Sequence, residues 1–130
     1  MIGMYSEHSG TFLQVVTIAM TLAFSIPITI MPLTWARILR WNLDEKPHLA
    51  LYFGRSLGVL ALVMSWAGWH AAGHTAVQPF FFNMFIGLAV LMIVVHVVGA
   101  LQKVQPWTET AEIPFWAGLA LLGLLFYPMA

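Results

Sequence analysis

Four long apolar stretches alternate with short polar segments along the chain, and this pattern predicts the fold. A helix that crosses the hydrocarbon core of a bilayer needs about 20 predominantly apolar residues. We therefore predict an all-α integral membrane protein, a four-transmembrane-helix bundle that forms a single membrane domain over residues 1–130. The expected spans cover approximately residues 11–31, 48–72, 80–101 and 112–127.

Prolines and glycines mark the ends of these stretches. Pro27 and Pro32 are expected to kink or end the first span, because proline lacks the backbone N–H that an α-helix requires. Gly73 and Pro79 are expected to interrupt the helical structure between the second and third spans. Pro114 falls in the first turn of the fourth span, where proline is tolerated.

The composition supports a lipid environment. Hydrophobic residues make up 61% of the chain and charged residues only 8%, whereas soluble domains carry about 25% charged residues. The formal net charge is zero, so the chain has no basic footprint for nucleic acid. It has no cysteine, which excludes disulfides, thiolate metal sites and thiol redox chemistry.

The basic residues predict how the spans are oriented. Arg37, Arg40 and Lys46 lie in or beside the first connecting segment, and Lys103 lies in the third. Because basic residues stay on the cytoplasmic side, both termini are expected on the outer side. We expect a multi-pass protein of the cell (inner) membrane that is in contact with membrane lipids.

One polar layer is predicted inside the membrane. Arg55, His96 and Glu112 come from three different spans and fall at a similar depth near the inner boundary. A charge in hydrocarbon costs about 3 kcal/mol on insertion scales, and an ion pair between Arg55 and Glu112 would offset part of that cost. The three residues form either a functional pocket or a structural ion pair, or Arg55 snorkels to the headgroups without them.

Two helical stripes accompany this layer. Small residues recur along the second span and predict close helix packing, most simply within one chain. A polar stripe along the first span either bonds other helices and its own carbonyls or forms the wall of a ligand cavity. The small stripe comprises Gly54, Gly58, Ala61, Ser65 and Gly68, and the polar stripe comprises Gln14, Thr17, Thr21, Ser25 and Thr29.

A second group of ionisable residues is expected on the outer side. His70 and His74 are four residues apart, and Glu7 and His8 lie on the same side. A helical histidine pair at this spacing can bind a metal ion, but Gly73 interrupts the helix there. We therefore interpret these four residues as interfacial polar groups, with a metal site as the alternative.

Two short motifs stand in the second and third spans: Arg55-Ser56-Leu57-Gly58, and a third span that begins with phenylalanines and ends with His96 and Gly99. With these motifs the chain resembles the DoxX-like superfamily of small four-span membrane proteins. The resemblance covers roughly residues 55–126, whereas the first span departs from the pattern of the family. The resemblance implies a compact four-helix bundle, with Arg55 and His96 as pocket or structural residues. It implies little about activity, because the group includes an oxidoreductase subunit and an assembly chaperone.

Three functional hypotheses remain open from the sequence. The first is a non-catalytic accessory, assembly or oligomeric subunit, which partners either copies of itself or other membrane subunits. The second is a binder or enzyme for a lipophilic molecule such as a quinone, a sterol or a lipid. Its pocket would lie between the polar stripe and Arg55, His96 and Glu112. The third is transport of a small ion or proton, which the single charged layer makes the weakest of the three.

Overall fold

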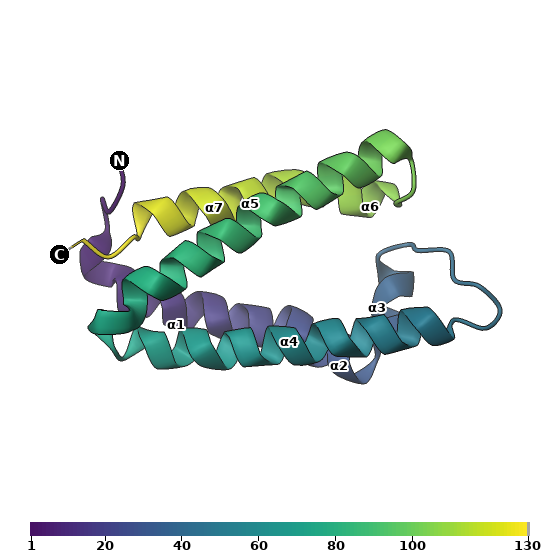
Figure 1. Cartoon of the computed structure of the whole chain (residues 1–130), viewed down its shortest axis with the longest axis horizontal. Coiled ribbons are helices and arrows are strands. Elements are labelled where there is room, and N and C mark those ends of the chain that lie inside the picture. The colour runs from purple at the N-terminus through teal and green to yellow at the C-terminus, as the bar shows by residue number, and fades with distance from the viewer. Residues whose placement is uncertain (130) are drawn as a thin grey trace.

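The computed structural model describes residues 1–129, and within these residues all regular structure is helical. The main helices form two layers: α1 pairs with α4 in one layer, and α5 pairs with α7 in the other (Figure 1). Short helices α2 and α3 follow α1, and α6 precedes α7. Their bounds are α1 Ser9–Met20, α2 Ile26–Ile30, α3 Pro32–Ile38, α4 His48–Ala72, α5 Gln78–Gln102, α6 Trp107–Thr110 and α7 Glu112–Leu125.

The first apolar stretch forms one continuous helical run, Ser6–Ile30. A π-helical turn, Thr21–Ser25, joins α1 to α2 within this run. Pro27 follows that turn and has no N–H to donate to the carbonyl of Ala23, so the regular bonding pattern is broken there. The predicted kink at Pro27 thus takes the form of a widened turn. The run ends at Met31, which has a non-helical φ of −130°.

Three helical segments are long and apolar enough to cross a membrane: Ser6–Ile30, His48–Ala72 and Thr75–Gln102. They match the first three predicted spans, so the chain is described as a multi-pass membrane protein. The fourth predicted span corresponds to α7, which has 14 residues and a length of about 21 Å at 1.5 Å per residue. This is shorter than the hydrocarbon core of about 30 Å, and α7 as a span remains a proposal.

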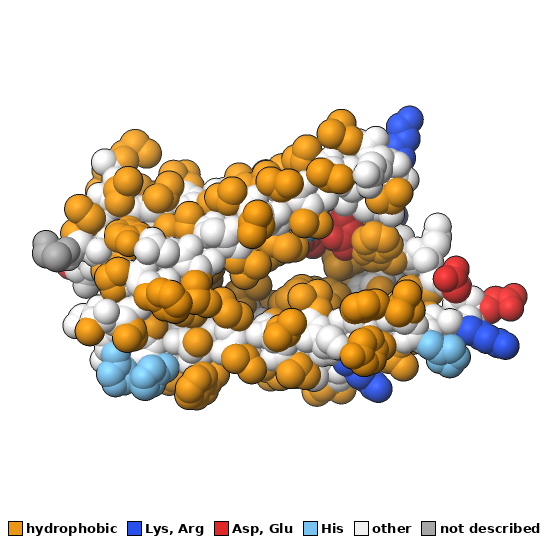
Figure 2. Space-filling model, viewed as in Figure 1, with side chains coloured by type: hydrophobic (Ala, Val, Ile, Leu, Met, Phe, Trp, Pro, Cys, Tyr) orange, Lys and Arg blue, Asp and Glu red, His pale blue; other side chains and the backbone are white. Residues whose placement is uncertain are grey.

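Hydrophobic side chains are spread over the face of the molecule that Figure 2 shows, as expected for a lipid environment. Both termini lie at one end of the molecule, whereas α3, α6 and the connection between α3 and α4 lie at the other (Figure 1). We call these the terminal end and the loop end.

The two layers are joined at the terminal end by an aromatic core. Leu13, Ala71, Phe81 and Phe82 are buried there and come from α1, α4 and α5. The N-terminal segment is also bonded to the end of α7, because Ser9 Oγ donates to the carbonyl of Phe126 across 2.7 Å. This end of the molecule is therefore closed.

The small residues of α4 are packed against the first helical run. A Cβ added at Gly54 would lie 2.5 Å from Cβ of Pro32, and one added at Gly58 would lie 2.7 Å from Cα of Thr29. Such distances are too short for real Cβ atoms, so glycine is required where α4 crosses the end of α2 and the start of α3. Gly54 and Gly58 of the small-residue stripe thus serve packing within the chain.

Two glycine substitutions test this packing. Gly58→Ala should lower the stability in detergent by about 1–3 kcal/mol, because the added methyl group overpacks a backbone contact. Gly87→Ala is the matched control, because a Cβ on that α5 glycine meets no atom within 4 Å. Thermal unfolding followed by circular dichroism should show a lower midpoint for Gly58→Ala alone. Equal midpoints for the two variants would contradict the close approach of α4 to α2.

Candidate functional site

His96 is a buried histidine of α5, and its ring is held in one orientation. The residue is 3% exposed. Its Nδ1 lies 2.7 Å from the carbonyl oxygen of Met92, one turn earlier. A carbonyl can only accept a hydrogen bond, so Nδ1 carries a proton and donates it. In the neutral ring, Nε2 is then left without a proton and free to accept a proton or bind a ligand.

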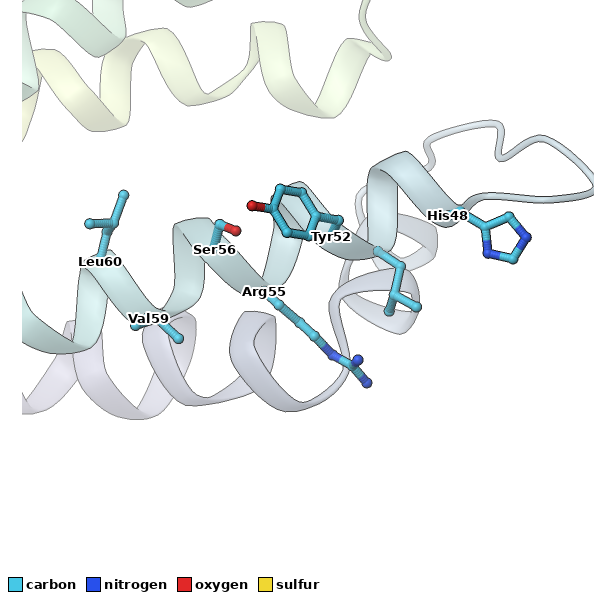
Figure 3. A pocket seen from close by; sticks show the side chains of 7 residues that line it. His48, Tyr52, Arg55, Ser56, Val59 and Leu60 are labelled. Carbon is cyan, nitrogen blue, oxygen red and sulfur yellow. The ribbon is translucent and has the colours of Figure 1, made fainter.

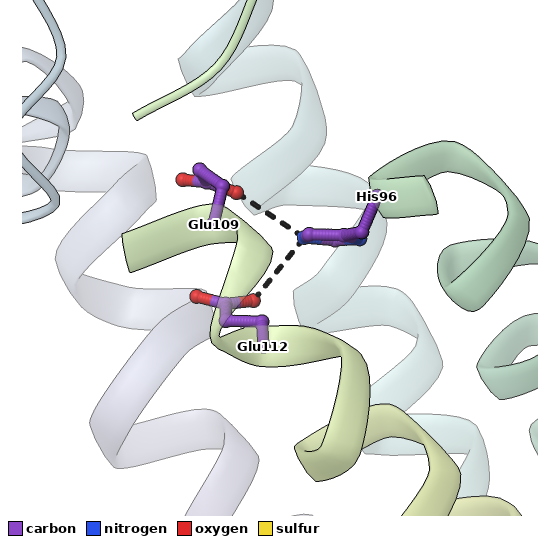
Figure 4. A group of neighbouring side chains, drawn as sticks. All are labelled: His96, Glu109 and Glu112. Carbon is purple, nitrogen blue, oxygen red and sulfur yellow. Dashed lines mark hydrogen bonds and ion pairs between the residues drawn. The ribbon is translucent and has the colours of Figure 1, made fainter. Parts of the chain in front are cut away.

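Two carboxylates face Nε2 of His96 (Figure 4). Oε2 of Glu109 lies 3.2 Å from Nε2, and Oε2 of Glu112 lies 3.5 Å from it. Both glutamates follow the turn after α5, where α6 begins at Trp107. Residues three apart share one helix face, so α6 and the first turn of α7 present both carboxylates to the same imidazole. We call His96, Glu109 and Glu112 the His96 cluster.

Two tryptophans fix the carboxylates of the His96 cluster. Nε1 of Trp41 donates to Oε1 of Glu109 across 2.7 Å, and Nε1 of Trp116 donates to Oε2 of Glu112 across 3.2 Å. Trp41 comes from the connection after α3, so its bond links the two layers at the loop end. The hydroxyl of Thr108 donates to the carbonyl of Leu39 beside it. These two bonds close the loop end.

The turn between α5 and α6 is held by one side chain. Nε2 of Gln105 donates to the carbonyl of His96 across 2.9 Å and to Oγ1 of Thr110 across 3.0 Å. Gly99 gives Gln105 its space, because a Cβ there would lie 2.8 Å from the Gln105 Cδ. The turn thereby places α6 back against α5, where Glu109 reaches His96.

The His96 cluster carries more negative charge than its partners balance. His96 is the only ion-pair partner of Glu109 and Glu112 among residues 1–129. Arg40 is one of the cations at the loop end, but its guanidinium lies over the ring of Trp107, 5.4 Å from the centroid. The side chains of Glu109 and Glu112 are 14% and 30% exposed. Their charges are therefore only partly solvated, which favours a proton or a cation within the cluster.

An apolar cavity of about 280 Å³ lies between the two layers. Figure 2 shows this region as a hollow in the middle of the molecule, with acidic side chains beside it. Met92 and Trp116 line the cavity and also bond the His96 cluster, so the cavity and the cluster share a wall. The lining residues are Val16, Thr17, Met20, Phe24, Ser25, Leu57, Leu60, Ala61, Met64, Ser65, Phe81, Phe85, Leu88, Met92, Trp116 and Leu119.

The polar stripe of the first span reaches this cavity only in part. Thr17 and Ser25 line it, whereas Thr21 lines a neighbouring surface groove and Gln14 is exposed. The hydroxyls of Thr17 and Thr21 donate to carbonyls of their own helix. Ser25 donates to the carbonyl of Met20 across the π-helical turn. The stripe is therefore mostly bonded within its own helix, and Gln14 does not belong to the cavity wall.

Arg55 does not join His96 and Glu112, and the expected ion pair with Glu112 is absent from the described residues. The side chain extends away from the layer of α5 and α7 along the outer face of α4 (Figure 3). It is exposed and lines a shallow groove together with His48 and Tyr52. The physical reason is helical rotation: Gly54 and Gly58 face the first helical run, and the neighbouring Arg55 is turned about 100° toward lipid at 3.6 residues per turn.

The outer histidines are exposed and close to each other. The rings of His70 and His74 are stacked with centroids 4.1 Å apart, and Nδ1 of His74 donates to the carbonyl of His70 across 2.8 Å. Nε2 of His8 lies 3.4 Å from a carboxylate oxygen of Glu7. Within residues 1–129, the group with metal-ligand spacing is the His96 cluster, and these four residues are not part of it.

Glu109 and Trp41 are the members of this region that the sequence did not assign to it. The spacing within the WTETAE segment contains the missed signal, since Glu109 and Glu112 share a face if the helix begins at Trp107. No sequence signal indicates Trp41, because its bond to Glu109 depends on how the two layers meet.

Comparisons with protein-family models, with curated proteins and with solved structures gave no match to this chain. The resemblance to the DoxX-like superfamily therefore has no support beyond its short motifs, and the functional argument rests on the geometry.

A double substitution tests the charge imbalance of the His96 cluster. Removing one partner from a buried ion pair costs about 3–5 kcal/mol, and the partial exposure of both carboxylates should reduce the loss for His96→Ala to about 2 kcal/mol. Adding Glu109→Gln to His96→Ala should restore part of the stability, because only one carboxylate then remains. Thermal unfolding of the single and double variants in chelator-containing detergent measures this coupling. Additive losses would contradict repulsion between the two carboxylates.

Proposed function

We propose that this multi-pass membrane protein binds one uncharged lipophilic molecule in the cavity between its two helical layers. The apolar cavity beside the His96 cluster is the single observation that carries the proposal. Its volume of about 280 Å³ is close to the lower end of small-molecule pockets, which hold about 300–1,000 Å³. Apolar walls with a few convergent polar groups are also typical of such pockets.

The polar groups near the cavity favour an uncharged occupant. Glu109 and Glu112 lie behind the wall formed by Trp116, and Arg55 is on the outer face of α4. An anionic headgroup would therefore meet two carboxylates and no arginine or lysine. An apolar molecule with a hydroxyl or carbonyl group avoids this repulsion. A quinone, a sterol or an uncharged lipid has this chemistry, whereas a fatty-acid anion does not.

The position of the site in the membrane is part of the proposal. Arg37 lies in the last turn of α3, Arg40, Lys46 and Lys103 lie in connecting segments, and Figure 2 shows basic side chains at the loop end. The positive-inside rule then places the loop end on the cytoplasmic side and both termini on the outer side. In this arrangement α7 is the fourth span of an inner-membrane protein, and the His96 cluster lies near the cytoplasmic boundary. The accessory-subunit and ion-transport hypotheses stay predictions.

A matched pair of tryptophan substitutions tests the occupied cavity. Leu88→Trp introduces bulk at a lining position of α5, and Leu91→Trp introduces the same bulk at an exposed, non-lining position one turn later. We expect native mass spectrometry of wild type, purified gently from membranes, to show one bound lipophile per chain. Leu91→Trp should retain this molecule. In Leu88→Trp, the fraction of chains that carry it should fall at least tenfold.

The control for folding is the thermal midpoint in detergent, which should be similar for both tryptophan variants. The proposal would be contradicted if wild-type protein carried no bound lipophile, or if both variants carried it at equal occupancy. A bound molecule that extraction identifies as a fatty-acid anion would contradict its uncharged class.

A further inference from the structure

We propose that the His96 cluster binds one divalent first-row transition-metal ion, of the class that includes Zn²⁺, Mn²⁺ and Fe²⁺. This inference goes beyond the proposed function, since it concerns a separate ligand behind the wall of the cavity. One nitrogen and two carboxylate oxygens converge there from α5, α6 and α7.

The spacing of the three donor atoms suits such an ion. Ligands about 2.1 Å from a tetrahedral metal lie about 3.4 Å from one another. Nε2 of His96 lies 3.2 Å from Oε2 of Glu109 and 3.5 Å from Oε2 of Glu112, and all three donor atoms lie within 4.8 Å of one another. An ion therefore needs only small side-chain shifts to reach all three.

The neighbouring hydrogen bonds orient the donors as in known metal centres. A metal-bound histidine usually donates its second ring N–H to a carbonyl or carboxylate, which fixes the other nitrogen as the ligand. Nδ1 of His96 makes such a bond to Met92 across 2.7 Å. Trp41 bonds Oε1 of Glu109, which leaves Oε2 facing the imidazole. The donor set is thus preorganised by residues outside it.

Charge also favours a cation over an empty cluster. Two partly buried carboxylates face one imidazole, and no lysine or arginine of residues 1–129 pairs with them. A divalent ion neutralises both carboxylates and leaves His96 as a neutral ligand. The imidazole nitrogen argues against Ca²⁺ and Mg²⁺, which prefer oxygen ligands. Three protein ligands leave a fourth position open for water or another small ligand.

Zinc titration of the full chain tests the site. We expect isothermal titration calorimetry of chelator-treated protein in detergent to show one equivalent of Zn²⁺ bound. Glu109→Gln keeps the size of the side chain and an acceptor for Trp41 but removes a ligand charge, so the affinity should fall at least tenfold. Trp41→Phe removes the hydrogen bond that orients Glu109 and links the layers at the loop end, and it should weaken binding about tenfold, within the usual range of 10–100-fold for such partners.

Two controls separate this site from other zinc binding and from the lipophile. Glu45→Gln removes an exposed carboxylate outside the cluster, and His74→Gln removes one of the stacked histidines; both should retain wild-type affinity at the cluster. Leu88→Trp should displace the lipophile from the cavity without changing zinc affinity, so each proposal can fail alone. Absence of zinc binding in wild type would overturn the inference, as would equal affinity of wild type and Glu109→Gln. A proton shared between His96 and the carboxylates would then explain the cluster.

Discussion

The cavity and the cluster depend on how the two helical layers are joined. α4 and α5 approach each other closely at Gly68, where an added Cβ would lie 2.7 Å from Cζ of Phe81. From the turn that connects them they diverge along their length (Figure 1). The bonds of Trp41 and Thr108 then link the layers again at the loop end. Divergence between two fixed ends leaves a space that the side chains fill only in part.

α1 contacts both layers beside this space. It packs along α4 in its own layer, and its Val16 and Met20 also contact the buried group of Ala89, Trp116 and Leu119 in the other layer. α1 therefore acts as a spacer along one side of the cavity. The wall opposite α4 contains Trp116, whose indole nitrogen is bonded to Glu112. The wall that contains Trp116 is thus fixed both by apolar packing against α1 and by the hydrogen bond to Glu112.

The sequence predicts the helices of this protein better than their mutual rotation. Hydrophobic length alone identifies the three helical segments that are long and apolar enough to cross a membrane, because the bilayer sets a minimum span. It also places His96 and Glu112 at one depth, and the structure brings them together. Depth along a helix does not specify which side of the helix a residue faces. Arg55 was therefore expected beside His96 and Glu112, although it lies on the outer face of α4. For the same reason, Gln14 was expected in the wall of the cavity, although it is exposed.

Contacts that depend on short turns were the least predictable. Glu109 lies in a segment that looked like a polar loop, and its role requires α6 to begin at Trp107 and fold back on α5. The bonds of Gln105 to His96 and Thr110 hold that geometry. Trp41 acts across a distance of 68 residues in the chain, which no local pattern encodes. The charged cluster could therefore be predicted in part, and its hydrogen-bonded surroundings could not.

The most direct measurement is the separation of the two layers in wild type and in the Leu88→Trp variant. The chain contains no cysteine, so spin labels can be placed on exposed Val63 of α4 and Leu91 of α5 after their replacement by cysteine. Pulsed electron paramagnetic resonance in lipid then gives the distance between the labels. If the ends hold the layers apart, the distance distribution should be narrow and unchanged when Leu88→Trp fills the cavity. A distance that increases in Leu88→Trp would show that the added indole forces the layers apart, and would contradict a preformed cavity held open by the two ends.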